Sequence, residues 1–213
     1  MGDEKLKESA TVLASLITFG LFCGSAPGEA HQTTKYTYYS IQGDSPASIY
    51  ATMIKRGPRV GGVKAYAKTL AVSTPSVQLI EGKTCKLENF TLNFDFDINL
   101  PKLKNEKAIT GRTSMEWQKF ARFLKSHEET HRRIWLDYGA ALEEKVRVIK
   151  ASSCAELATK IINLRQQMAE KCNKDQEAFD VAQQRVLLQQ PFVKLVLSQS
   201  SASTQALKVH KKK

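Results

Sequence analysis

Residues 85–101 read CKLENFTLNFDFDINLP, and they alternate apolar and polar side chains more regularly than any other stretch of the chain. The apolar positions are even-numbered, from Phe90 to Leu100, and Thr, Asn and Asp stand between them. A period of two places one set of side chains on a buried face and the other in water, as in an antiparallel sheet. Pro101 is expected to end this strand, because proline cannot donate to a strand ladder.

Further strands are predicted at residues 34–41, 64–73 and 76–80. The first of them is rich in tyrosine and β-branched residues, which favour strands. A short helix is expected to follow it, with Ser45 as the N-cap and Pro46 at the first helical position. Gly57 and Pro58 should end that helix.

The second half of the chain is predicted to be helical. Apolar side chains recur at spacings of three and four from Trp117 to Val146, and again from Leu157 to Phe179. The second helix is expected over residues 154–184, capped by Ser152 or Ser153. Because the loop at about residues 150–153 is short, the two helices should lie antiparallel. The predicted fold is α+β, with a small antiparallel sheet packed against a long C-terminal helical hairpin.

One domain is predicted over residues 31–190, with a different kind of segment on each side. Residues 10–25 are mostly apolar but too few to span a bilayer comfortably, and Gly28 and Ala30 resemble a cleavage site. Residues 1–30 are therefore interpreted as a signal peptide, which predicts export to the periplasm or beyond and no stable membrane span after cleavage. The alternative is an apolar helix that tethers the chain or stays internal. Residues 191–213 are predicted to be a disordered basic tail.

The chain carries a formal charge of +11. Such a surface attracts anions, so weak binding to anionic polymers of the cell envelope is expected. Its lysines and arginines are scattered, and no aromatic run of the kind that stacks on single strands accompanies them. Specific binding of nucleic acid is therefore not expected.

The chemistry of the chain is concentrated in residues 126–137, SHEETHRRIWLD, which contain the pattern HExxH. Residues i and i+4 of a helix share a face, so His127 and His131 can hold one metal ion. Glu128 can then reach a water beside that metal and act as the catalytic acid and base, with Zn²⁺ as the expected ion. The alternative is two buried histidines and a surface ion pair between Glu128 and Arg132.

A third protein ligand is expected, because catalytic zinc usually has three. Asp137 is disfavoured, because Ile134 lets the helix continue and carries Asp137 away from His131. If the chain reverses direction near residue 151, counting equally far along both helices places residues 171–175 opposite the two histidines. The candidates on the second helix are Asp175, Glu177 and Asp180, with Cys172 as a further one.

Three cysteines follow the predicted signal peptide. Cys154 and Cys172 are eighteen residues apart on one predicted helix, roughly 27 Å, which excludes a bridge between them. A bridge between Cys85 and Cys154 would join a strand to the start of the last helix. The alternative is three reduced, buried thiols.

The chain resembles the DUF922 family over roughly residues 35–185. The resemblance is carried, in order, by YYSIQGDSPASIYATMIKRGP, a cysteine-bearing strand ending in NLP, a tryptophan, FARFLKSHEETHRRI and SSCAEL. Members are bacterial and are described as predicted secreted zinc-dependent proteases. The resemblance implies His127 and His131 as metal ligands, Glu128 as the catalytic acid and base, and a Cys85–Cys154 bridge.

Members of that family carry a segment like Tyr-Asp-x-x-Thr-x-His-Gly late in the second helix. The corresponding stretch here is FDVAQQRV, which keeps Asp180 but has Gln183, Arg185 and Val186 at the last three fixed positions. The expected function is a secreted zinc-dependent metallohydrolase, most simply a peptidase acting on a peptide or protein. The alternative is a non-catalytic cationic protein of the cell envelope with a degenerate metal site.

Overall fold

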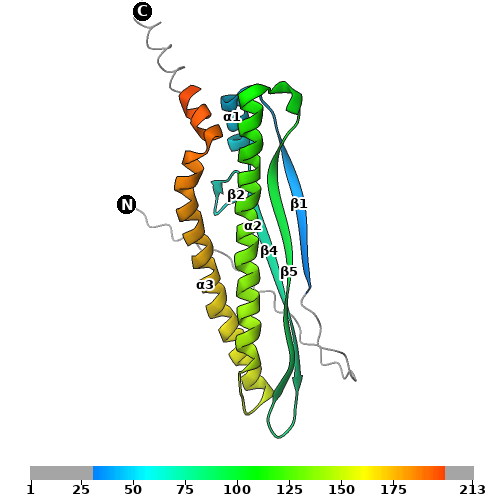
Figure 1. Cartoon of the computed structure of the whole chain (residues 1–213). Helices are drawn as coiled ribbons and strands as arrows, with labels where there is room; N and C mark the ends of the chain where they lie inside the picture. The colour runs from blue at the N-terminus through cyan, green and yellow to red at the C-terminus, as the bar shows by residue number, and fades with distance from the viewer. Residues whose placement is uncertain (1–30, 200–213) are drawn as a thin grey trace, which may run out of the picture.

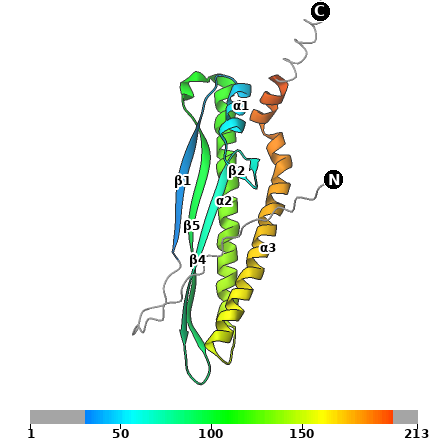
Figure 2. The ribbon, with the colours of Figure 1, turned by 180° about the vertical axis from the view of Figure 1, so that it is seen from behind.

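The structure is a computed structural model that describes residues 31–199. The predicted signal peptide and residues 200–213 lie outside this range. The elements follow in the order β1 (Gln32–Ile41), α1 (Pro46–Arg56), β2 (Arg59–Val60), β3 (Val63–Lys64), β4 (Lys68–Ile80), β5 (Lys86–Leu103), the 3₁₀ turn η1 (Glu106–Ala108), α2 (Gly111–Arg147) and α3 (Cys154–Gln189). The molecule is elongated, and α2 lies between the sheet and α3 (Figure 1; Figure 2 gives the reverse view). The α+β class and the long helical hairpin are confirmed.

The sheet is mixed rather than antiparallel throughout. Its strand order is β1-β5-β4, with β4 antiparallel and β1 parallel to the central strand β5. The alternating pattern of β5 shows that one of its faces is buried, but alternation does not fix the direction of a neighbouring strand. Residues 68–80 also form one strand instead of two, because Pro75 lies on the edge strand β4, where proline is tolerated.

The central strand continues past Pro101 to Leu103, so the expected end at the proline is wrong. Pairing with β4 stops at Asn99, whereas pairing with β1 continues through Pro101 to Leu103. Beyond Asn99, β5 therefore has one hydrogen-bonded neighbour, and a residue without an N–H is accommodated there. The even-numbered residues of β5 from Phe90 to Leu100 are all buried, as the alternation predicted.

The buried side chains form two clusters, one toward each end of α2. The cluster near the N-terminal end of α2, called the upper cluster, includes Ile41, Ile49, Trp117, Phe120 and Phe192. The cluster near the C-terminal end of α2, called the lower cluster, includes Phe94, Phe96, Leu142, Leu157 and Cys172. Helix α2 contributes to both clusters, through Trp117, Phe120 and Leu124 above and through Tyr138, Leu142 and Val146 below. The HExxH segment therefore lies between the two cores.

Residues 191–199 are helical and packed, so the expected disordered tail is wrong for this part of it. Phe192 is fully buried, and Val193 and Val196 are each 5% exposed. The ring of Phe192 stacks on Phe120 at 5.2 Å between centroids and meets Trp117 edge-on at 5.4 Å. The apolar positions 192, 193 and 196 are helically spaced, and this burial draws the segment onto α2.

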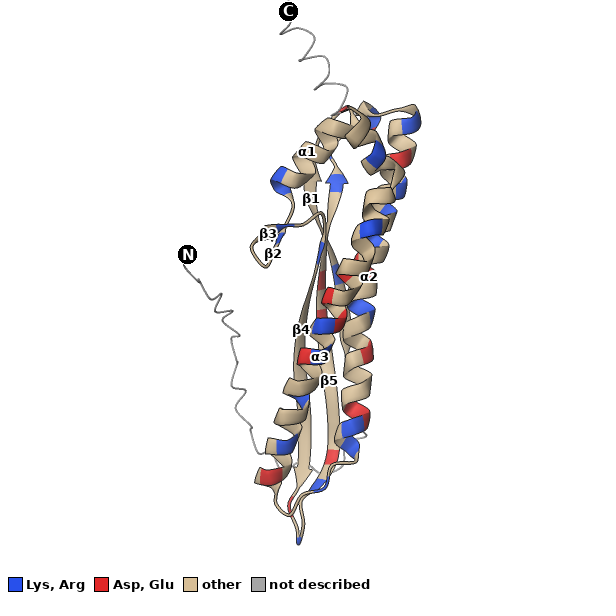
Figure 3. Ribbon diagram, turned by 90° about the vertical axis from the view of Figure 1, so that its left-hand side faces the viewer, with Lys and Arg blue, Asp and Glu red and all other residues tan. Residues whose placement is uncertain are grey.

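The Cys85–Cys154 disulfide is present, with an S–S distance of 2.00 Å and 4.9 Å between the α-carbons. It joins the end of the β4–β5 hairpin to the first residue of α3. Cys172 is a buried free thiol, and burial raises its pKa to about 11. Lys and Arg are distributed along both long helices and interspersed with Asp and Glu, as Figure 3 shows.

Candidate metal centre

His127 and His131 present their rings to one another near the middle of α2. Their Nε2 atoms are 3.0 Å apart and their ring centroids 4.7 Å apart. One helical turn separates the two residues, so both side chains leave α2 on the same face. The ring of Phe179, on α3, stacks against His127 at 4.8 Å and meets His131 edge-on at 5.1 Å. This aromatic contact limits the rotation of both imidazoles.

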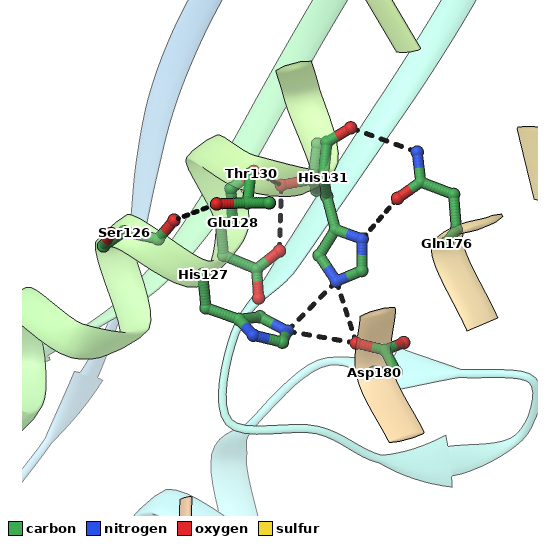
Figure 4. Close-up of polar contacts among 8 residues, drawn as sticks. Ser126, His127, Glu128, Thr130, His131, Gln176 and Asp180 are labelled. Atoms are coloured by element: carbon green, nitrogen blue, oxygen red, sulfur yellow. Dashed lines mark hydrogen bonds and ion pairs between the residues drawn. The ribbon is translucent and has the colours of Figure 1, made fainter. Parts of the chain in front are cut away.

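Asp180 and the two histidines form a group of three polar side chains, called the cluster from here on. Its Oδ1 atom lies 3.1 Å from His127 Nε2 and 2.9 Å from His131 Nε2 (Figure 4). Among the described residues these three form a group of side chains whose ligand atoms converge closely enough to hold one metal ion. Ligand atoms around a tetrahedral zinc ion lie roughly 3.3 Å apart, because each bond is about 2.0–2.2 Å long. The distances in the cluster are close to that value.

The other candidate ligands are directed elsewhere. Asp175 forms an ion pair with Lys171 at 2.6 Å, and Glu177 is exposed. Cys172 is buried in the lower core, and Asp137 is exposed on α2. Of the residues considered from the sequence, the structure therefore brings Asp180 alone to the two histidines.

The predicted register of the hairpin was wrong by five residues. Reflection placed residue 175 opposite His127 and residue 171 opposite His131, whereas the structure places Asp180 and Gln176 there. The cause is the connection at residues 148–153, which does not turn tightly. Ala151 forms a β-bridge with Cys85, which draws the connection along the hairpin tip before α3 begins. Helix α3 therefore begins beyond the point where α2 ends, and each position on α2 faces a residue further along α3.

Gln176 sets the protonation of His131, a role that sequence reasoning missed. Its side-chain N–H donates to the His131 carbonyl oxygen at 3.0 Å, so its Oε1 is left to accept from His131 Nδ1, at 2.5 Å. With the proton on Nδ1, the lone pair of Nε2 is available toward His127 and Asp180. A glutamine four residues before a candidate carboxylate ligand, on the same helical face, is the signal that could have identified it.

The cluster attracts a cation. Burial raises the pKa of the Asp180 carboxyl, but hydrogen bonds from His127 and His131 outweigh it and lower the pKa well below its usual range. Burial lowers the pKa of His131, but hydrogen bonds to Asp180 and Gln176 outweigh it and raise that pKa above 6.5. When neither Nε2 atom carries a proton, the cluster holds three acceptor atoms that repel one another unless a metal ion lies between them. Two imidazoles and a carboxylate form an N/O donor set that suits zinc, so the residues fit that ion.

Glu128 is buried beside the cluster, 4% exposed, and does not form the surface ion pair that was the alternative. Its Oε2 accepts from the Thr69 hydroxyl on β4 at 2.8 Å, and Figure 4 shows its carboxylate next to both imidazoles. Arg132 instead contacts Thr34 and Gln32 on β1 and pairs with Glu129. Burial raises the pKa of Glu128, and the Thr69 hydrogen bond opposes that rise in part.

A family model for bacterial proteins of unknown function, DUF922, matches residues 36–186. The chain belongs to the DUF922 family. The match contains both histidines, Glu128, Asp180 and both cysteines of the disulfide, so the DUF922 region includes the whole cluster. No curated protein and no solved structure matches the chain.

At the last three fixed positions of the DUF922-like segment late in α3, the residues that depart from it lie outside the candidate metal cluster. Asp180, which the segment keeps, is in the cluster, whereas Gln183 lines an adjoining pocket. Arg185 and Val186 are exposed. Within residues 31–199, no helix of this DUF922 protein combines the length and the apolar character that crossing a membrane requires.

Proposed function

We propose that this protein is an exported zinc-dependent hydrolase that cleaves peptide bonds. The observation that carries the proposal is the convergence of His127 Nε2, His131 Nε2 and Asp180 Oδ1 within 3.1 Å, beside the buried carboxylate of Glu128. Gln176 supports it, because by accepting from His131 Nδ1 it leaves the Nε2 lone pair of the neutral imidazole available to a metal ion.

Each residue has a distinct part in this proposal. His127, His131 and Asp180 would hold the ion, which supplies Lewis acidity toward a carbonyl oxygen and lowers the pKa of water. Glu128 takes one proton from water as the water oxygen bonds to the carbonyl carbon. When the carbon–nitrogen bond breaks, Glu128 returns that proton to the departing amine nitrogen. A raised carboxyl pKa suits a group that must both accept and release a proton near neutral pH.

Peptides are the proposed substrates because HExxH on a helix is the pattern of metalloproteases. Export is proposed from the apolar segment at residues 10–25 and from the Cys85–Cys154 disulfide, since such bonds persist in oxidising compartments. The alternative, a cationic envelope protein that binds without catalysis, makes the opposite prediction for metal content.

Metal analysis of the purified protein tests the proposal. We expect about one zinc per chain, lost in His127→Ala, His131→Ala and Asp180→Ala and retained in Asp175→Ala, which removes an exposed carboxylate from the same helix. Glu128→Gln should keep the zinc and lose hydrolysis of a peptide mixture, whereas the neighbouring Glu129→Gln should hydrolyse it normally. Absence of zinc in the wild-type protein would favour the non-catalytic alternative, and near-normal hydrolysis by Glu128→Gln would remove Glu128 from the mechanism.

A further inference from the structure

A pocket of about 310 Å³ opens between α2 and α3 directly beside the cluster. His127 and Asp180 form one end of it, and its walls are mainly the apolar side chains of Phe123, Leu124, Val181 and Leu187. Gln183 and Gln184 supply neutral polar groups. The pocket and the metal cluster therefore share two residues and form one continuous site.

The pocket lies between two sets of contacts with α2, one made by α3 and one by the helical segment that follows it. At the lower level, Gln176 and Asp180 bond to the histidines of α2. At the upper level, Phe192 packs on Phe120 and Trp117. Leu124 and Leu187 lie between these levels, where the helices leave a space that no side chain fills.

We propose that this pocket receives an apolar side chain of the substrate, aliphatic or with a single aromatic ring, from a residue that adjoins the cleaved bond. The inference rests on the proposed function, because it places the reacting carbonyl at the cluster. A substrate whose carbonyl reaches the cluster would have a neighbouring side chain at the mouth of the pocket, since His127 and Asp180 belong to both.

Size and charge decide the kind of side chain. Small-molecule pockets range over roughly 300–1,000 Å³, so this pocket is at the small end and suits one side chain rather than an extended ligand. Asp180 supplies the one carboxylate of its lining, and both histidines already engage it. A basic side chain would therefore find no free counter-charge, and an acidic one would meet Asp180.

A matched pair of variants distinguishes an effect at the pocket from a general effect on α3. Val181 is 73% exposed at the pocket, and Val186 is 42% exposed on the same helix outside it. Val181→Glu would place a carboxylate at the pocket without removing a core side chain. Val186→Glu makes the same chemical change where no substrate side chain is expected.

Two readouts test the inference. Cleavage sites in a mixed peptide library, mapped by mass spectrometry, should be enriched for Leu, Ile, Met or Phe at one fixed position next to the cleaved bond. Independently of turnover, leucine hydroxamate should bind zinc-loaded Glu128→Gln about 10- to 100-fold more tightly than aspartate hydroxamate, as expected for burial of one apolar side chain. Adding Val181→Glu should remove most of that ratio, and adding Val186→Glu should preserve it.

The outcomes distinguish this inference from the proposed function. Cleavage without any residue preference, or equal binding of the two hydroxamates, overturns the pocket assignment and leaves the hydrolase intact. A leucine preference that Val181→Glu removes, in a protein that cleaves no peptide, supports the pocket and overturns the hydrolase. An equal effect of Val181→Glu and Val186→Glu overturns the pocket assignment as well.

Discussion

Gln176 bonds to His131 twice, through its amide nitrogen to the main-chain oxygen and through its amide oxygen to Nδ1 of the ring. The first bond fixes which end of the amide faces the ring, and the second fixes which ring nitrogen carries a proton. A residue on α3 thus controls the ring orientation and the tautomer of a residue on α2. Partners of this kind commonly tune the affinity of a metal site.

Replacing Gln176 by alanine should weaken zinc binding by about 10- to 100-fold, because His131 loses the acceptor that keeps its proton on Nδ1. Gln176→Glu should bind zinc more tightly than Gln176→Ala but less tightly than the wild type, since a carboxylate accepts from Nδ1 but cannot donate to the His131 carbonyl oxygen. Competition against a zinc chelator measures both, with Gln166→Ala as a control at an exposed position of the same helix. Wild-type affinity in Gln176→Ala would show that the tautomer is set by other means.

In chelated, metal-free protein, His131 should titrate above its ordinary pKa of 6.5, and Asp180→Asn should lower that pKa because the carboxylate acceptor is gone. Titration of the imidazole carbon-bound protons by NMR measures this directly. A pKa of His131 that does not fall in Asp180→Asn would contradict the arrangement of Figure 4.

The same pair makes the stability of the metal-free protein depend on pH. A raised histidine pKa stabilises the fold fully below 6.5, and this contribution is lost as pH rises through the folded-state value. The lowered pKa of Asp180 contributes above 3.8 and is lost as pH falls toward the folded-state value. The difference in Tm between wild type and Asp180→Asn should therefore be largest between about pH 4 and 6.5 and should shrink above that window.

Removing the disulfide by Cys85→Ala together with Cys154→Ala should lower the free energy of unfolding by about 4 kcal/mol, because the bridge closes a segment of 69 residues in the unfolded chain. Denaturant unfolding under oxidising conditions measures the loss. A reductant should destabilise the wild type by a similar amount and leave the double variant unchanged. Equal sensitivity of both proteins to the reductant would contradict the assigned pairing.

Phe192→Ala should lower the free energy of unfolding by about 3–5 kcal/mol, because a fully buried ring leaves a cavity against Phe120 and Trp117. Leu188→Ala is the control, since Leu188 is 52% exposed and should change stability by less than about 0.5 kcal/mol. A similarly small change in Phe192→Ala would mean that residues 191–199 do not pack on α2 in solution.

The sequence predicted those features whose cause is local. The alternation of β5, the cap at Ser45 and the one-turn spacing of the two histidines each depend on neighbours within a few residues, and the structure contains all three. The direction of β1 relative to β5 was not predictable in this way, because it depends on how α1 and the β2–β3 hairpin carry the chain across the sheet.

Identifying the third candidate ligand required a helix register that the sequence does not encode locally. Asp180 was one of four candidates on α3. Choosing among them depended on the path of residues 148–153, which the β-bridge between Ala151 and Cys85 determines. The packing of Phe192 was predictable in part from the sequence. Pro191 suits the first position of a helix, and Phe192, Val193 and Val196 follow with helical spacing, but the polar residues beyond them led to the prediction of a disordered tail.

The connection at residues 148–153 and the disulfide together limit how the number of residues between Cys154 and Asp180 can vary. Asp180 follows Cys154 by 26 residues along one uninterrupted helix, and the disulfide fixes where that helix starts. A single inserted or deleted residue between them would turn the carboxylate about 100° away from the histidines. Length changes among relatives that keep this group of three side chains are therefore expected in the connections at residues 81–84 and 104–110, while the segment from Cys154 to Asp180 retains a constant number of residues.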